Sequence, residues 1–575
     1  ILANWKLDIK KICDIKPESF SPKPKIDSSL LFFTPKQNFY KFKDPKNLEK
    51  ITRIFFSQRR KMLKKPFNQL FNGNIDICMM NYTISKVHAL IKNGNLTAEI
   101  LVSKYLERID KIDKSGPKIN SIIEINPDAI IIAKELDAYY EKNGMKGPLH
   151  GIPILIKDNI DTDDKMKTTA GSKTIEEYGG DCKKDASIVV KLRKAGAIIL
   201  GKTNLSEMAN FRGKRSMSGW SSRGGRTKNP YVLNRSTSGS SSGSAAAIAA
   251  NLAIGAIGTE TDGSIISPSQ ANGIVGIKPS LGLVSRTGII PISHSQDTAG
   301  PMTRSVEDAC KILNAISGYD NEDKFMNKLD DNMYEFQIDN NKSNLKNYKL
   351  GVLRDKFGFH DKVDSLINNS IEKLKELGAE IIDPIELETH ENLGMLEFEV
   401  LLHEYNGDII NYFENRENNT IYSLEELKKY NIENEQLTMP FFGQEFIELA
   451  LDREGLKTEK YLEAMTAYKI FKENLNKCFV DNNIDALVAP SGGPAWIADK
   501  LNGDFYGGGS SQIAAVSGYC NITVPAGYID ELPVGINFIG NRFDDEKIIN
   551  IANIYEKNTL WRKDPEFIES LEVDL

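Results

Sequence analysis

The chain is poor in the residues that mark metal centres, disulfide frameworks and membrane spans. Its 575 residues include 6 Cys and 6 His, and the cysteines, at positions 13, 78, 182, 310, 478 and 520, form neither a Cys-x-x-Cys pair nor a Cys/His cluster. Such spacing indicates buried thiols in a reducing compartment, so we expect a cytoplasmic protein with no metal and no other cofactor. No run of 18 apolar residues occurs, and no transmembrane helix is predicted.

An excess of one charge is also missing. Lys and Arg number 73 against 79 Asp and Glu, for a formal net charge of −6, which offers no general attraction to nucleic acid or to an anionic membrane. A hydrophobic content of 40% and a charged content of 26% are typical of a globular protein. The chain begins with Ile1 rather than Met and shows no secretory signal, and it looks truncated at its start.

The most informative stretch is 236–304. It opens with seven Ser or Thr and two Gly between Ser236 and Ser244, continues through an Ala/Ile run, and reaches a second small-residue turn at 261–264. Small residues let the backbone turn sharply and leave N–H groups and hydroxyls accessible to a ligand. A flexible Gly/Ser linker would not continue into a long run of Ile, Val and Ala, so we interpret this stretch as a buried loop system.

Three pieces of this stretch, 238–247, 258–268 and 273–279, resemble the amidase signature family of serine hydrolases. The family's Gly-Gly-Ser-Ser-Gly-Gly-Ser-Ala pattern appears as Ser-Gly-Ser-Ser-Ser-Gly-Ser-Ala at 238–245. With GPLHGIPILIKDNI at 147–160, the resemblance covers residues 80–571. There are two departures: Ser242 stands where the family usually has Gly, and Ile266 stands where many members have Arg.

The resemblance implies a Ser-cisSer-Lys triad. Ser264 would be the nucleophile, Ser240 a relay in a cis peptide, and Lys157 the base; Ser240 and Ser264 lie 24 residues apart, as in the family. The resemblance also suggests an oxyanion hole and substrate contacts. The oxyanion hole would use the N–H groups of Thr261, Asp262, Gly263 and Ser264, and the substrate contacts would be Ser238, Gly239 and Met208. Ordinary core packing explains Met208 equally well.

Lys157 ends a short apolar strand predicted at 154–156. An unpaired ammonium is costly to bury, so the residues alone favour a Lys that pairs with Asp158 or reaches solvent. The resemblance instead makes Lys157 a neutral base, which requires lowering its pKa from about 10.4 to ~7–8, or ~4 kcal/mol against the charged form. His150 is the other nearby base, but the family does not use it, so we give it no chemical role.

Alternating helix and strand patterns predict an α/β, amidase-signature-type layered fold. Helical periodicity at 84–109 and 188–195 and buried strand patterns at 197–204 and 485–490 indicate a mixed, mostly parallel central sheet covered by helices on both faces. Residues 388–480 are expected to be mostly helical. In the family, such a region lines the entrance and sets substrate choice.

Residues 1–78 differ from the rest of the chain. Basic segments occur at 21–25 and 57–65, and FSPKPKIDSS at 20–29 with FSQRRK at 56–61 is similar to the C-terminal part of small-subunit rRNA adenine dimethyltransferases. The resemblance implies a short α+β fragment without methyltransferase activity, because the methyl-donor loop would lie upstream. We interpret residues 1–78 as a fused or truncated piece before an amidase domain at 80–571. Nucleic-acid contact is expected only through basic residues 1–73, whose commoner explanation is a solvated helix face.

These features predict a bacterial-type amidase whose partner is a small-molecule or peptide amide. It would hydrolyse a carboxylic amide or a peptide C-terminal amide to acid and ammonia through an acyl-enzyme. The alternative is the glutamine-hydrolysing A subunit of a tRNA-dependent amidotransferase. The segment 289–301 looks closer to the free-standing peptide amidases, and Ile266 in place of Arg points the same way.

Overall fold

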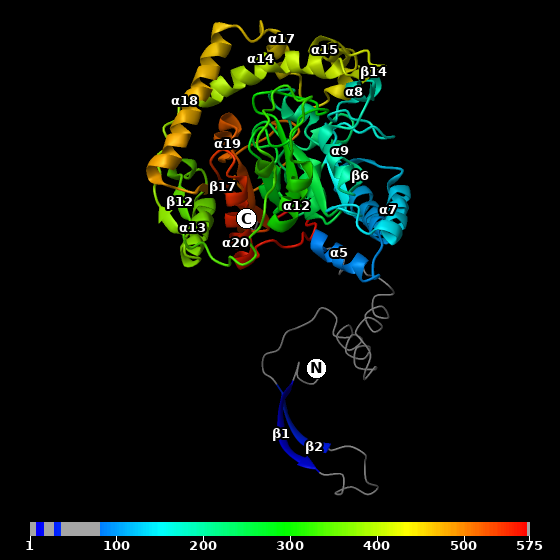
Figure 1. The fold of residues 1–575 in the computed structure, drawn as a ribbon, viewed down its shortest axis with the longest axis vertical. Coiled ribbons are helices and arrows are strands. Elements are labelled where there is room, and N and C mark those ends of the chain that lie inside the picture. The colour runs from blue at the N-terminus through cyan, green and yellow to red at the C-terminus, as the bar shows by residue number, and fades with distance from the viewer. Residues whose placement is uncertain (1–6, 16–27, 36–80, 572–575) are drawn as a thin grey trace. The chain divides into compact units, whose positions relative to one another are not determined.

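A computed structural model describes residues 7–15, 28–35 and 81–571 and divides the chain into two compact units, Ile1–Asn81 and Tyr82–Leu575 (Figure 1). In the first unit, β1 (Leu7–Ile15) and β2 (Ser28–Pro35) form an antiparallel pair. The basic segments 21–25 and 57–65, for which nucleic-acid contact was considered, lie outside the described residues.

The second unit is built on an eleven-stranded sheet. In spatial order its strands are β13 (Glu380–Ile382), β12 (Lys349–Val352), β15 (Ala486–Pro490), β17 (Leu532–Ile539), β16 (Asn521–Ile529), β10 (Val275–Lys278), β11 (Thr298–Thr303), β9 (Gly255–Glu260), β4 (Pro153–Lys157), β6 (Ile198–Thr203) and β3 (Ile122–Ile125). The predicted α/β class and mixed sheet are confirmed.

Parallel pairing is less frequent than the sequence suggested. In this sheet of the described chain, β13–β12, β12–β15, β9–β4 and β4–β6 are parallel, and the other six neighbouring pairs are antiparallel. The reason lies in the connections, since β16 and β17 are joined by the two-residue turn 530–531 and β10 returns to β11 through a loop without a helix. Short connections of this kind make antiparallel neighbours, whereas parallel neighbours need a long crossover.

Helices cover both faces of the sheet, as predicted (Figure 1). Side chains alternate between the faces of a strand, so positions 255 and 258 of β9 face opposite sides. A Cβ on Gly255 would meet Ile312 of α12 (Val306–Ile316), and one on Gly258 would meet Ser241, which precedes α10 (Ser242–Ala249). The helices that contact the strands of the sheet include α7 (Ala129–Asn143), α9 (Ser187–Lys194), α10, α11 (Ile266–Ala271), α12, α13 (Asp361–Glu376) and α20 (Asp545–Thr559). Of the other helices, α5 (Ile84–Lys92) is hydrogen-bonded to α12, α6 (Ala98–Ile109) packs on α7, and α19 (Ser511–Ser517) packs on α18 (Glu459–Asn482).

The stretch 236–304 is a buried loop system rather than a linker, which confirms that interpretation. All eight residues of α10 are buried, and a helix that is apolar or small all round belongs in an interior. A Cβ at Gly243 would lie 2.2 Å from the carbonyl oxygen of Ser121 and 2.4 Å from that of Asn204. The small residues therefore allow this helix to press directly against neighbouring backbone.

Residues 388–480 are mostly helical, as expected. They form α14 (Leu393–Phe413), α15 (Leu424–Glu433), α16 (Glu435–Thr438), α17 (Glu445–Leu451) and α18 (Glu459–Asn482), and α8 (Lys173–Tyr178) packs against α15 and α16. Figure 1 shows α14 and α18 lying at the edge of the unit beyond the sheet. None of the helices described is long and apolar enough to cross a membrane.

Candidate active site

A cavity of about 400 Å³ lies where β9 ends. The turn 261–264 and the loop residues Ser238, Gly239 and Ser240 form part of its wall, so the structure brings both Gly/Ser turns of the sequence together. Apolar side chains from distant segments form another part of the wall, and they are Phe211, Ile292, Leu401, Phe446 and Trp496. Polar side chains such as Lys214, Asp504 and Ser511 line much of the rest, so the cavity offers both polar and apolar surface to a small molecule.

Lys157 ends β4 and is completely buried beside this cavity. Its Nζ donates hydrogen bonds to Ser240 Oγ at 2.7 Å, to Thr259 Oγ1 at 2.8 Å and to the Thr259 carbonyl oxygen at 3.1 Å. Burial lowers the pKa of Lys157 to about 7, although the negative charges of Asp297 and Glu260 act in the opposite direction. An amine with this pKa is substantially neutral near pH 7 and can accept a proton from Ser240.

The alternative in which Lys157 pairs with Asp158 is wrong. Asp158 Oδ1 lies 3.2 Å from Arg223 Nη1, and its Oδ2 accepts a hydrogen bond from the Gly171 N–H at 3.1 Å. Neighbouring residues of a strand point to opposite faces, so Lys157 and Asp158 are directed into different surroundings.

Ser240 lies between Lys157 and the cavity. The peptide bond between Gly239 and Ser240 is cis, and the Ser240 side chain is buried. The Ser240 carbonyl oxygen accepts a hydrogen bond from the Ser206 N–H at 3.1 Å. A Cβ at Gly239 would lie 2.3 Å from Ser206 Oγ, so the loop passes too close to Ser206 for any larger residue.

The turn 261–264 leaves its N–H groups available. Within the described residues, the main-chain N–H groups of Thr261, Asp262, Gly263 and Ser264 donate to no protein acceptor. Glu260 holds the next turn of chain, because its Oε2 accepts hydrogen bonds from the N–H groups of Ile265 at 2.6 Å and Ile266 at 2.9 Å. Free N–H groups at the wall of a cavity are suited to an anionic oxygen.

Asp297 supports the turn from behind, and sequence reasoning did not find it. Thr261 Oγ1 donates a hydrogen bond to Asp297 Oδ1 at 2.5 Å, and burial raises the pKa of Asp297 to about 6. Thr259 and Glu260 are two further contributors that the sequence did not single out. Glu260 and Thr259 stand inside the recognised motif, but nothing local marks Asp297, which reaches the turn only because β11 pairs with β9.

The two departures from the family pattern are both accommodated. The Ser242 hydroxyl donates a hydrogen bond to the Ser238 carbonyl oxygen at 2.7 Å, which ties the first turn of α10 to the cavity loop. Ile266 is completely buried at the start of α11.

Met208 does not line the cavity, contrary to the expectation that it contacts substrate. It is 2% exposed and belongs to an apolar cluster with Leu205 and Ile290. Residues 208, 209 and 210 all have left-handed backbones, with φ of 52°, 54° and 71°. This local rotation turns Met208 into the core, while Ala209, Asn210 and Phe211 line the cavity instead.

His150 lies in a separate turn and does not line the cavity. Its ring Nδ1 accepts a hydrogen bond from the Lys146 N–H at 3.2 Å, and the ring of Tyr140 packs against it with centroids 5.6 Å apart. These contacts are consistent with the absence of a chemical role for His150.

Gly263→Ala should lower kcat by about 10²-fold or more, beyond what the ~1–2 kcal/mol cost of an Ala at positive φ explains. Gly263 has φ of +73°, and an added Cβ would lie 2.9 Å from both Ser267 Oγ and Ser511 Oγ, so the turn must shift. Gly282→Ala is the matched control, since Gly282 also has a positive φ of +97° but no atom within 4 Å of the added Cβ. Steady-state kinetics and thermal unfolding of both variants check this, and equal kinetic losses would contradict it.

The chain belongs to the amidase family, whose family model matches residues 101–549. It is therefore a hydrolase that acts on amide bonds. A second family model, for ribosomal RNA adenine dimethylase, matches residues 1–112. That match extends into α5 and α6, which lie in the second structural unit.

Relatives of known structure and sequence give the same family. The crystal structure of a peptide amidase from Stenotrophomonas maltophilia is similar, with 40% identity and a TM-score of 0.78 over 85% of this chain and 99% of that one. A probable amidase of Arabidopsis thaliana is 38% identical over 84% of this chain and 91% of its own length. The glutamyl-tRNA(Gln) amidotransferase of Thermoanaerobacter pseudethanolicus has an A subunit that is 33% identical over 85% of this chain and 99% of its own length.

Proposed function

We propose that this amidase hydrolyses a carboxylic amide or a peptide C-terminal amide to the acid and ammonia, with Ser264 as nucleophile, Ser240 as relay and Lys157 as base. The observation that carries the proposal is the hydrogen bond of 2.7 Å from buried Lys157 Nζ to Ser240 Oγ, at the wall of a cavity that also contains Ser264. A Ser hydroxyl needs such a base because it is a weak nucleophile while it keeps its proton.

The reaction proceeds in two halves. Ser264 Oγ attacks the amide carbonyl carbon, and its proton passes through Ser240 to neutral Lys157. The N–H groups of the turn 261–264 stabilise the resulting oxyanion. The C–N bond then breaks, the proton returns through Ser240 to the departing nitrogen as ammonia leaves, and an ester to Ser264 remains. Water attacks this acyl-enzyme by the same proton route and releases the acid.

The enzyme acts by itself on a small-molecule or peptide amide, rather than on glutamine as one subunit of a larger complex. The similarity to a peptide amidase over 85% of this chain supports this choice. The alternative, a glutamine-hydrolysing A subunit, is supported by 33% identity to an amidotransferase subunit. Release of ammonia from a panel of small amides, peptide amides and glutamine separates the two, and hydrolysis of glutamine alone would overturn the first choice.

We place the reaction in the cytoplasm. The cysteines in the described part of the chain, at positions 182, 310, 478 and 520, are free, and burial raises the pKa of the Cys310 thiol to about 12. Unreactive buried thiols suit a reducing compartment. Cell fractionation tests this, and recovery with secreted proteins would contradict it.

A chain that begins at Met80 should retain the full kcat. We propose that the amidase domain spans residues 80–571, because the first helix packed on the sheet unit, α5, begins only at Ile84. The Ile84 N–H donates to Asp308 Oδ1 at 3.0 Å, and Arg304 donates to the Tyr82 carbonyl oxygen at 3.1 Å, so these anchors survive the truncation. Equal kcat and thermal stability of the two chains is the expected result. A folded but inactive shorter chain would show that residues 1–79 contribute to the site.

A further inference from the structure

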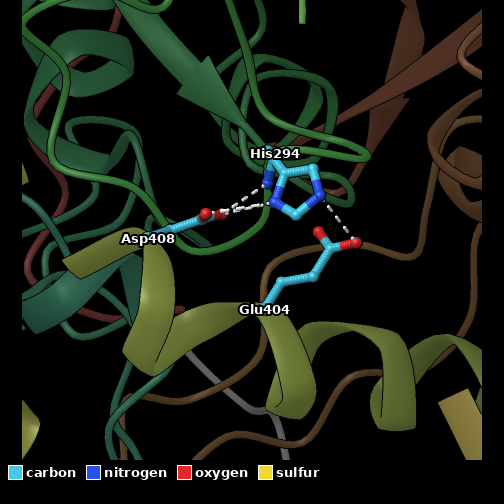
Figure 2. Close-up of side chains that lie close together, drawn as sticks. All are labelled: His294, Glu404 and Asp408. Atoms are coloured by element: carbon cyan, nitrogen blue, oxygen red, sulfur yellow. Dashed lines mark hydrogen bonds and ion pairs between the residues drawn. The ribbon is translucent and has the colours of Figure 1, made fainter. Parts of the chain in front are cut away.

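A histidine, His294, lies between two carboxylates of α14, Glu404 and Asp408 (Figure 2). His294 Nδ1 lies 3.0 Å from both carboxylate oxygens of Asp408, and its Nε2 lies 3.3 Å from Glu404 Oε1. The His294 main-chain N–H also donates to Asp408 Oδ2 at 2.8 Å. Glu404 and Asp408 lie one turn apart on α14, so both carboxylates on one face of this helix contact the same imidazole ring.

The contacts favour a doubly protonated ring. An ionised carboxylate only accepts hydrogen bonds, so each ring nitrogen that faces one should carry a proton. Burial acts to lower the pKa of His294, but the hydrogen bond to Asp408 and the charge of Glu404 outweigh it and raise the pKa above the ordinary value. Side chains from the surrounding segments are Phe325, stacked on the ring at 4.1 Å, and Arg286, which donates to the His294 carbonyl oxygen and pairs with Asp323.

Glu404 is a fixed anchor for the same segment. It accepts hydrogen bonds from Ser293 Oγ at 2.5 Å, from the Ser295 N–H at 3.0 Å and from Tyr461 Oη of α18 at 2.7 Å. The carboxylate is therefore held from both sides before His294 is counted. The segment 292–297 is thus attached to α14 by hydrogen bonds from uncharged donors to Glu404 and by the contact of the His294 ring with Glu404 and Asp408. We call this three-residue contact the clasp.

This segment reaches the proposed oxyanion turn through its last two residues. Gln296 Nε2 donates to the Thr261 carbonyl oxygen at 3.1 Å and to Glu397 Oε1 of α14 at 2.9 Å. Asp297 accepts the Thr261 hydroxyl at 2.5 Å and the Ile292 N–H at 2.8 Å. The clasp and the turn therefore belong to one hydrogen-bonded chain of residues.

We propose that His294 is a positioning residue: as an imidazolium between Glu404 and Asp408, it holds segment 292–297 against α14 and thereby sets the geometry of the turn Thr261–Ser264. The proposal rests on the proposed function, because the turn matters to rate only if it binds the oxyanion. Loss of the ring proton leaves two buried carboxylates without their shared cation, and mutual repulsion loosens the segment.

The same three side chains could also hold a metal ion, since their ligand atoms lie within 4.8 Å of one another. Both ring nitrogens and both Glu404 oxygens already have protein partners, so an ion would have to break several of these contacts. Without a metal ion, the hydrogen bonds and ion pairs of the clasp already give these ring nitrogens and carboxylate oxygens partners. Metal binding is therefore tested as the alternative.

The clasp predicts a bell-shaped dependence of kcat on pH. The rate rises as Lys157 loses its proton through a pKa of about 7. A group whose folded pKa is raised keeps its effect at low pH and loses it as the pH rises through that pKa, so the rate falls again when His294 deprotonates. The alkaline limb is therefore assigned to a residue that does not touch substrate.

The test compares full-length wild type with Asp408→Asn, His294→Gln and the double variant His294→Gln/Asp408→Asn. Asp408→Asn removes one carboxylate and should move the alkaline limb to lower pH, which lowers kcat at and above pH 7 more than it lowers kcat below pH 7. His294→Gln should lower kcat by up to about 10²-fold with a smaller change in KM, the cost of a misplaced turn. The double variant should recover part of this loss, because only one unpaired carboxylate remains. His403→Gln is the matched control, since His403 is a buried α14 histidine bonded to Thr458 Oγ1 at 2.9 Å and should change stability alone.

Each measurement has an outcome that would overturn the clasp. A pH profile of Asp408→Asn that superimposes on that of the wild type would overturn it. This measurement requires only that Asp408→Asn folds, even if His294→Gln does not. Zinc bound by the wild type and not by His294→Gln, or activity removed by a chelator, would assign a metal site instead. The rate of Ser264 labelling by a fluorophosphonate is measured alongside, because it requires the oxyanion turn but no amide turnover. If the labelling rate falls in the His294 and Asp408 variants but no amide is hydrolysed by the wild type, the proposed function is refuted and the positioning role of His294 still holds.

Discussion

Replacing Lys157 by Ala should lower kcat by about 10²–10⁴-fold, and replacing it by Arg should not restore activity. The reason is that the proposed base is the neutral form of Lys157, which burial makes accessible by lowering the pKa to about 7. A guanidinium stays protonated at every usable pH and cannot accept the proton from Ser240. Steady-state kinetics of the two variants against wild type provide the measurement, and an active Arg variant would refute the neutral-base role.

The pH dependence gives an independent check on Lys157. In wild type, kcat should rise with pH through an apparent pKa near 7, because only the unprotonated amine works as a base. Lys202→Met is the matched control, since Lys202 is also completely buried but bonds to Thr168 Oγ1 at 2.8 Å, away from Ser240. It should lower the melting temperature and leave the acid limb unchanged. His150→Ala should likewise cost far less than Lys157→Ala.

Ser264→Ala should abolish hydrolysis and leave the fold intact. The change removes one oxygen from the turn and little packing, yet it deletes the proposed nucleophile. A fluorophosphonate should label Ser264 in wild type, and labelling should disappear in Ser264→Ala. Ser267→Ala is the control, because Ser267 lines the same cavity but has no assigned role. Labelling at Ser240 instead would reverse the roles of nucleophile and relay.

Much of the fold could be predicted because the relevant signals are local. The periodic apolar residues Ile84, Val87 and Ile91 are the buried face of α5, and the apolar pattern at 485–490 became β15. The direction of strand pairing was not predictable in the same way. It depends on the route that the chain takes between strands, and the loop from β10 to β11 carries no periodic signal that reveals an antiparallel return.

The candidate site divides along the same line. The sequence pattern identified Lys157, Ser240 and the turn 261–264, which the structure places at one end of the cavity or directly beside it. Met208, for which core packing was an equal explanation, lies in the core, because residues 208–210 all have left-handed backbones. Asp297 and His294 were missed, because their partners, Thr261 and α14, lie far from them along the chain.

By itself, the sequence determined the amidase family, the α/β class and the pair of Gly/Ser turns, since small residues and apolar periodicity act over a few positions. Only the tertiary structure decided which partner Lys157 takes. Its position at the end of a strand would allow an ion pair with Asp158 or a hydrogen bond to Ser240. Because β4 pairs with β9, the amine reaches Ser240 and Thr259, and Asp158 pairs with Arg223 instead. The pKa of Lys157 follows from that choice, because desolvation depends on everything that surrounds the amine and not on its neighbours in sequence.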